Sequence, residues 1–173
     1  KNTDPTLLIL SSDHSIEDED KFKKSIKQSI KEASNGNLVI FGVIPTYPAT
    51  SYGYVKSTNK ITSKAKNISK VENFIEKPNQ QTAELLFKDN KYTWNSGMFV
   101  FKAKAILKEL EKYSPDIIKK CQNCLSKSKR DLDFIRLEKN YFSNCPEVSI
   151  DIAVFEKTEK AFALPLDCGW NDV

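Results

Sequence analysis

Short apolar runs alternate with polar, helix-patterned stretches in the first third of the chain. Residues 7–10 (Leu-Leu-Ile-Leu) and 38–44 are continuous apolar runs of the length typical of buried strands. Between them, residues 16–33 carry apolar side chains at helical spacing, and Asn35-Gly36 ends that helix. The order strand, helix, strand predicts a right-handed crossover between two parallel strands.

The rest of the chain continues this mixture of strands and helices. A polar stretch at 57–69 predicts an exposed hairpin tip between strands at 52–56 and 71–76. Further strands are expected at 98–101 and 161–166. Helices are expected at 80–88, 104–112, 114–125 (with Ser114 as N-cap and Pro115 in the first turn), 132–141 and 149–157. The pattern predicts an α/β fold with a mixed central sheet flanked by helices.

Composition excludes several classes of protein. The 173 residues are 39% hydrophobic and 29% charged, too apolar for a disordered chain. No apolar run approaches the roughly 18 residues of a membrane span. The net charge of +4 is spread along the sequence, whereas a nucleic-acid binder would show clustered basic residues. We therefore expect no membrane and no nucleic-acid partner. The chain starts without Met and ends abruptly, so we expect a piece of a longer protein.

Four cysteines raise the question of a metal or redox site. Cys121 and Cys124 have the spacing of metal ligands, but Cys145, Cys168 and the single His14 stand far from them in the sequence. A structural zinc site usually has two paired half-sites, so ordinary helix thiols are the favoured interpretation over zinc or redox chemistry. Unpaired cysteines without an export signal favour a reducing cytoplasm.

Polar segments with chemical potential lie where strands are expected to end. In an open α/β sheet, ligands bind at such ends. Each segment also has a plain structural explanation: a helix cap, a tight turn or a solvated strand end. The segments are Asp13-His14, Tyr52-Gly53-Tyr54, Glu76-Lys77-Pro78, Asn95-Ser96-Gly97 and the run from Asp167 to Asp172. Carboxylates, Lys and Gly with one histidine suit phosphoryl transfer, in which positioning and charge neutralisation dominate catalysis.

Taken in order, these segments resemble the mannose-1-phosphate guanylyltransferase family. The matching runs are Asp13-His14, residues 41–46 with 52–54, 74–78, 94–99, 145–158 and 165–173. The similarity is to the bacterial form of this family, which serves polysaccharide biosynthesis and is often fused to a mannose-6-phosphate isomerase domain. It implies the nucleotide-diphospho-sugar transferase (GT-A-like) fold and a cytoplasmic enzyme that joins GTP and mannose 1-phosphate into GDP-mannose and pyrophosphate.

The resemblance also implies roles for individual residues. Asp13 and Asp172 would bind Mg²⁺, and Lys77 the sugar phosphate, so these three form the expected catalytic set. The expected substrate-binding residues, besides Lys77, are Tyr52, Gly53, Glu76, Asn95, Ser96, Gly97 and, with less support from its motif, Asp151. Homo-oligomerisation stays open.

One element of the family pattern does not occur in this sequence. The glycine-rich nucleotide loop, Gly-x-Gly-x-Arg-Leu-x-Pro-Leu, belongs ahead of Lys1. We therefore expect residues 1–173 to be a partial nucleotidyltransferase domain, incomplete at its N-terminus and nearly inactive alone. Two alternatives stay open: a transferase for another sugar 1-phosphate or base, and a non-catalytic sugar-phosphate binding module.

Overall fold

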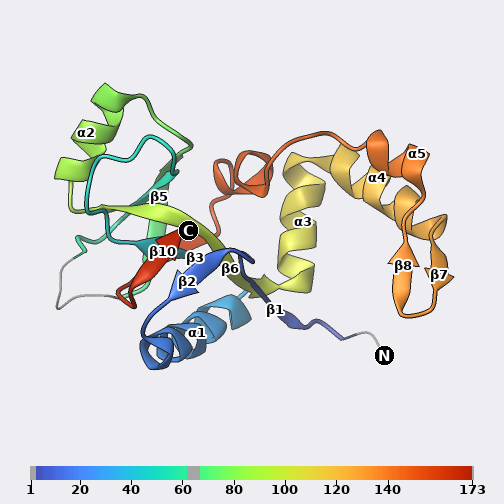
Figure 1. Ribbon diagram of the computed structural model, residues 1–173, viewed down its shortest axis with the longest axis horizontal. Helices are drawn as coiled ribbons and strands as arrows, with labels where there is room; N and C mark the ends of the chain where they lie inside the picture. The colour runs from blue at the N-terminus through green and yellow to red at the C-terminus, as the bar shows by residue number, and fades with distance from the viewer. Residues whose placement is uncertain (1–2, 62–66, 173) are drawn as a thin grey trace. The chain divides into compact units, whose positions relative to one another are not determined.

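The computed structural model describes residues 3–61 and 67–172 (Figure 1). The chain divides into two compact units, one formed by Lys1–Ala105 with Thr158–Val173 and the other by Ile106–Lys157. Among the helices of the described ranges, none is long and apolar enough to cross a membrane.

A mixed β-sheet forms the centre of the first unit. Within the described residues it has six strands, in which β3 and β9 are parallel and the other neighbours are antiparallel. The first residues of β6 also pair with β4. The order is β1 (Thr6–Ile9), β6 (Tyr92–Lys102), β3 (Leu38–Val43), β9 (Ala161–Leu166), β5 (Ser69–Ile75) and β4 (Tyr54–Ser57). A separate pair joins β2 (His14–Ile16) to β10 (Trp170–Asp172). The mixed sheet confirms the predicted fold class.

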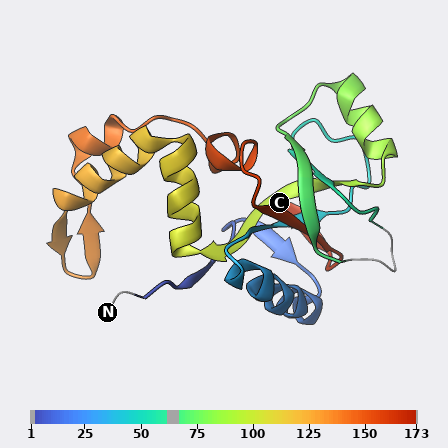
Figure 2. The same ribbon diagram turned by 180° about the vertical axis from the view of Figure 1, so that it is seen from behind.

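Two helices cover the apolar surfaces of this sheet. Helix α1 (Glu19–Ser34) starts at Asp18, whose carboxylate accepts a hydrogen bond from the Lys21 backbone N–H at 2.9 Å. Both ribbon views show α1 lying along the sheet (Figures 1 and 2), where Phe22 packs in a buried cluster with strand residues such as Phe41. Helix α2 (Gln80–Lys88) contributes to a second cluster around Trp94.

The second unit is mainly helical. Helices α4 and α5 pack together, and a small hairpin of β7 and β8 connects them. Ser114 precedes α4 as predicted, but its hydroxyl donates to the Ala153 carbonyl at 3.1 Å instead of capping the helix. The elements are α3 (Ala103–Tyr113, starting in the first unit), α4 (Pro115–Ser126), β7 (Lys129–Asp131), β8 (Phe134–Arg136), α5 (Lys139–Ser143) and a π-helical turn, η1 (Asp151–Phe155).

Most of the predicted elements are confirmed. The strands at 38–44, 71–76, 98–101 and 161–166 and the helices at 80–88, 104–112 and 114–125 match β3, β5, β6, β9, α2, α3 and α4. The helix at 149–157 is present only as η1. The strands β1 and β3 run in the same direction, as the crossover predicts, but β6 lies between them. The hairpin that joins β4 to β5 is confirmed, although residues 62–66 of its expected tip lie outside the described residues.

Three sequence predictions are wrong. Most of the helix expected at 132–141 is absent: residues 132–136 belong to the β7–β8 hairpin and only residues 139–141 are helical, in α5. Leu132 takes a left-handed conformation (φ 53°) at the hairpin turn, and Arg136 pairs with Asp131 across it at 2.9 Å. The strand at 7–10 is not buried: β1 lies at the end of the strand order, and Leu8 and Ile9 are about two-fifths exposed. Helix α1 begins at Glu19 and not at residue 16, because residues 14–16 form β2 and Asp18 provides the N-cap.

Gly42 of β3 gives the first testable prediction. A Cβ atom there would clash with Oγ1 of buried Thr93 and would lie 2.7 Å from its Cβ and 3.1 Å from its Cγ2. We expect Gly42→Ala to lower the free energy of unfolding by about 1–3 kcal/mol, because the side chain cannot be accommodated without strain. Urea denaturation measures this loss. In a Thr93→Gly background, which removes all three clashing atoms, the cost of Gly42→Ala should largely disappear; additive effects would contradict the steric explanation.

Candidate functional site

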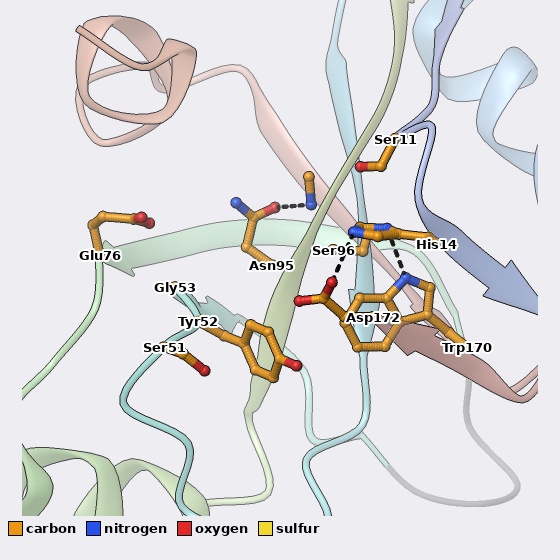
Figure 3. Close-up of a pocket in the computed structure, with 11 residues that line it drawn as sticks. Ser11, His14, Ser51, Tyr52, Gly53, Glu76, Asn95, Ser96, Trp170 and Asp172 are labelled. Atoms are coloured by element: carbon orange, nitrogen blue, oxygen red, sulfur yellow. Dashed lines mark hydrogen bonds and ion pairs between the residues drawn. The ribbon is translucent and has the colours of Figure 1, made fainter.

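A small polar pocket of about 180 Å³ lies in the first unit (Figure 3). Five segments line it: residues 11–14, which lead from β1 into β2, the loop before β4, the residue after β5, the middle of β6, and β10. It therefore collects polar groups at the ends and irregularities of strands, where the sequence predicted a ligand site.

An irregularity in β6 turns three polar residues toward this pocket. Between the pairs Ile40–Phe99 and Gly42–Asn95, three residues of β6 lie opposite the single residue Phe41 of β3. The bulge depends on Gly97, whose φ of +68° is strained for residues with a side chain. Asn95, Ser96 and Gly97 are thus part of a long strand, and the turn that their composition also allowed is absent here.

Hydrogen bonds fix the bulge and its side chains. The Ser96 hydroxyl donates to the Phe41 carbonyl at 2.7 Å and accepts from the Met98 N–H at 3.2 Å. The Asn95 side-chain oxygen accepts from the Gly97 N–H at 3.1 Å, and the Asn95 N–H donates to the Gly53 carbonyl at 2.7 Å. These polar groups are hydrogen-bonded to one another within the protein, so this wall of the pocket is held in place before a ligand binds.

Glu76 and Gly53 form the opposite wall. A Cβ atom on Gly53 would lie 2.6 Å from Oε2 of Glu76, so the glycine leaves the space in which the carboxylate sits. Lys77 has a φ of +43°, and this left-handed residue breaks the alternation of strand side chains. Its ammonium therefore lies 3.9 Å from Oε1 of Glu76, while the lysine side chain remains 67% exposed.

His14 connects the pocket to two carboxylates. It pairs with Asp172 across the β2–β10 ladder, and its Nδ1 accepts a hydrogen bond from the Trp170 indole N–H at 3.1 Å. The two rings meet edge to face, with their centroids 5.1 Å apart. Since Nδ1 is an acceptor, the neutral imidazole carries its proton on Nε2. That nitrogen lies 3.8 Å from Asp172 Oδ1 and 4.0 Å from Asp13 Oδ1.

The two carboxylates are chemically suited to magnesium. Both lie within 4.0 Å of the same His14 nitrogen, so they converge on one region beside the pocket. Mg²⁺ prefers oxygen ligands and is commonly bound by one or two carboxylates together with substrate phosphates and water. Across residues 3–61 and 67–172, no group of three or more His, Cys, Asp or Glu side chains could hold a metal ion alone. The arrangement fits an ion whose remaining ligands come with the substrate.

Aromatic side chains pack against one another beside the polar groups of the pocket. Tyr52 packs against both Trp94 and Trp170, and Tyr47 packs against Trp94. Burial, the neighbouring Tyr47 and the Asp172 carboxylate raise the pKa of Tyr52 to about 12. The phenol consequently keeps its proton at physiological pH and remains a hydrogen-bond donor beside Asp172.

The fold brings together most of the residues singled out from the sequence. Seven line the pocket: Tyr52, Gly53, Glu76, Asn95, Ser96, Gly97 and Asp172. Two further residues do not line the pocket but contact residues that do: Asp13 lies 4.0 Å from His14, and Lys77 lies 3.9 Å from Glu76. Asp151 belongs to the second unit, at the start of η1, and its role stays a prediction.

Four lining residues were missed by the sequence interpretation. Ser11, His14, Ser51 and Trp170 also line the pocket. His14 and Trp170 stood in recognised motifs, but nothing in the sequence pattern indicated that β2 and β10 pair. Ser11 and Ser51 carried no signal beyond their places in loops.

Comparisons with known proteins agree with this arrangement. The family described as nucleotidyl transferase matches residues 1–173. The chain is 45% identical over 99% of its length to a mannose-1-phosphate guanylyltransferase of Escherichia coli, covering 37% of that protein. It is 46% identical over 98% of its length to the xanthan biosynthesis protein XanB of Xanthomonas campestris (strain B100), covering 35% of it. The chain thus spans little more than a third of these curated relatives.

A solved structure shows the same fold. The crystal structure of a mannose-6-phosphate isomerase from Helicobacter pylori matches with a TM-score of 0.89 and 33% identity. The match covers 99% of this chain and 66% of that one.

The hydrogen bond between Trp170 and His14 gives a prediction that does not depend on activity. His14 is the single histidine of the sequence, so its ring nitrogens give unambiguous signals in a long-range ¹H–¹⁵N NMR spectrum. At alkaline pH we expect the Nε2–H tautomer in the wild type, because the Trp170 N–H occupies Nδ1. Trp170→Phe should give a mixture of tautomers.

The matched control is Tyr47→Phe, which alters the same aromatic cluster without touching His14. Its spectrum should equal that of the wild type. An unchanged tautomer in Trp170→Phe would show that the indole does not orient the imidazole.

Proposed function

This chain belongs to the nucleotidyl transferase family, and from that premise we propose that it is the sugar-phosphate part of an enzyme that joins GTP and α-D-mannose 1-phosphate into GDP-mannose and pyrophosphate. The observation that carries the proposal is the convergence of Glu76, Asn95 and Asp172 on one small pocket. The names of the relatives, which act on mannose phosphates or belong to xanthan biosynthesis, support the choice of sugar and a role in making polysaccharides.

The size and lining of the pocket suit one sugar ring. Its volume of about 180 Å³ is below the range of about 300–1,000 Å³ that drug-sized ligands occupy. In the proposal, the Glu76 carboxylate and the Asn95 side-chain amide bind mannose hydroxyls. Gly53 contributes by leaving the space in which the Glu76 carboxylate sits. The exposed Lys77 ammonium, 3.9 Å from the Glu76 carboxylate, would bind the sugar phosphate.

The proposed reaction is an in-line displacement. An oxygen of mannose 1-phosphate attacks the α-phosphorus of GTP, the new P–O bond forms, and pyrophosphate leaves. Asp13 and Asp172 would hold Mg²⁺, which neutralises charge on the phosphates when bound. In this proposal, the residues of this chain bind the sugar, orient its phosphate and position the two carboxylates. The need for GTP as a substrate and the unpaired cysteine thiols favour the cytoplasm as the compartment of the reaction.

The direct test is an assay of the protein that contains this chain. With GTP, mannose 1-phosphate and Mg²⁺, we expect GDP-mannose and pyrophosphate in equal amounts, and little product when UTP or glucose 1-phosphate replaces its counterpart. Preference for another sugar phosphate or nucleotide would favour a related transferase. Binding of mannose 1-phosphate without turnover would favour a non-catalytic module.

Two substitutions separate sugar binding from catalysis. Glu76→Gln should raise KM for mannose 1-phosphate by about 10- to 100-fold, the effect of losing hydrogen bonds to a charged group, and change kcat little. Asp172→Asn should lower kcat by at least about 100-fold.

The matched controls carry the same chemical change at exposed positions. Glu84→Gln on α2 and Asp133→Asn at the β7–β8 turn should behave as the wild type. If Glu76→Gln and Asp172→Asn do not differ from these controls, the proposed roles are wrong.

A further inference from the structure

The second unit contains a thiol pair that the sequence did not suggest. Cys121 lies on α4 and Cys145 follows α5, yet their sulfur atoms are 4.0 Å apart. Cys124, which shares the C-x-x-C motif with Cys121, is buried, and its thiol donates to the Glu138 carbonyl at 3.7 Å. The helix thus directs the two thiols of the motif toward different neighbours.

The two sulfur atoms, 4.0 Å apart, are in contact, which is the starting point that a disulfide requires. A disulfide has sulfur atoms about 2.05 Å apart and Cβ atoms about 3.5–4.5 Å apart. Rotation of the two cysteine side chains can bring sulfur atoms that are already in contact most of the way to the bonded distance. The position of Cys145 is held by its own backbone N–H, which donates to the Phe142 carbonyl at 3.0 Å. We propose that Cys121 and Cys145 form a site of reversible oxidation that closes to an intramolecular disulfide with small disulfides such as oxidised glutathione.

The chemistry is a two-step thiol–disulfide exchange. Cys121 is the exposed member of the pair, so its thiolate attacks one sulfur of the small disulfide, and one glutathione thiolate leaves. The Cys145 thiolate then attacks Sγ of Cys121 and displaces the second glutathione. The two protein thiols lose two protons and two electrons in total, and the small disulfide is reduced to two thiols. An excess of dithiol reverses both steps.

Other uses of these cysteines are less well supported. Within the part of the chain that the structure describes, no set of three or more His, Cys, Asp or Glu side chains is arranged to hold a metal ion. Burial and the neighbouring Cys145 raise the pKa of Cys121, so the pair is a slow nucleophile at neutral pH and reacts faster in alkali.

Oxidation would have a local structural effect. The two cysteines are 24 positions apart, and the intervening segment holds the β7–β8 hairpin and α5. A bond between them ties α5 to α4 and restricts the unfolded chain. This inference concerns the second unit alone and is independent of the proposed transferase function.

The test is oxidation of the wild-type protein with oxidised glutathione at mildly alkaline pH. After the remaining thiols are blocked, non-reducing digestion and mass spectrometry should identify a Cys121–Cys145 peptide. Of the four thiols in residues 1–173, two should become inaccessible to alkylation, without covalent dimers. Dithiothreitol should restore all of them. A Cys121–Cys124 peptide, or a stable glutathione adduct on Cys121, would overturn the proposal.

Serine variants provide the matched comparison. Cys124→Ser should form the disulfide as the wild type does, whereas Cys145→Ser should stop at the glutathione adduct of Cys121. Equal melting temperatures of the reduced proteins would confirm that the variants fold. If Cys145→Ser still loses two thiols, or if Cys124→Ser fails to form the bond although it folds, the pairing is wrong.

Discussion

The pairing of β2 with β10 is the constraint on which the candidate site depends. Two three-residue strands are marginal by themselves, and the Trp170–His14 hydrogen bond joins residues 156 positions apart. Other contacts support this ladder: the backbone N–H groups of Glu17 and Asp18 donate to the Cys168 carbonyl, and Trp170 packs against both buried clusters of the first unit. Packing of the partly buried Trp170 indole, together with these backbone hydrogen bonds, therefore holds Asp172 near Asp13.

Departures from regular sheet geometry position the remaining polar groups. A regular strand alternates its side chains between two faces, so neighbouring residues cannot line one pocket. The bulge at Gly97 turns Asn95 and Ser96 toward the pocket, and the left-handed conformation of Lys77 brings its ammonium back beside Glu76. Because successive strand residues point to opposite faces, Glu76 and Lys77 can share a face only where the chain bends, and the positive φ of Lys77 supplies that bend. Such strained residues are common at functional sites.

Elements whose hydrophobic pattern spans several helical turns or strand residues were predictable from the sequence. Very short strands that pair through tertiary contacts, and single residues in unusual backbone conformations, were not. Strand β3 and helix α1 are long enough for their hydrophobic patterns to be recognised in the sequence. β2 and β10 are too short for a pattern, and their pairing depends on tertiary contacts. Leu132 and Ile135 have helical spacing, but a left-handed turn makes them part of a hairpin. The pocket residues came from the order of motifs in a known family; their convergence came from the fold.

The charge of the site argues for a cation beyond those of the protein. Of the described residues that line the pocket, none is Lys or Arg, whereas Glu76 and Asp172 both carry carboxylates, and Asp13 lies close by. Like charges gathered in one small site repel each other, and burial strengthens the repulsion. A sugar phosphate entering here would meet two or three carboxylates, with the exposed Lys77 as a weakly held, solvent-screened partner. A divalent ion between Asp13 and Asp172 would convert this repulsion into attraction. In the proposed function, the metal ion and the anionic substrate would therefore each make binding of the other more favourable.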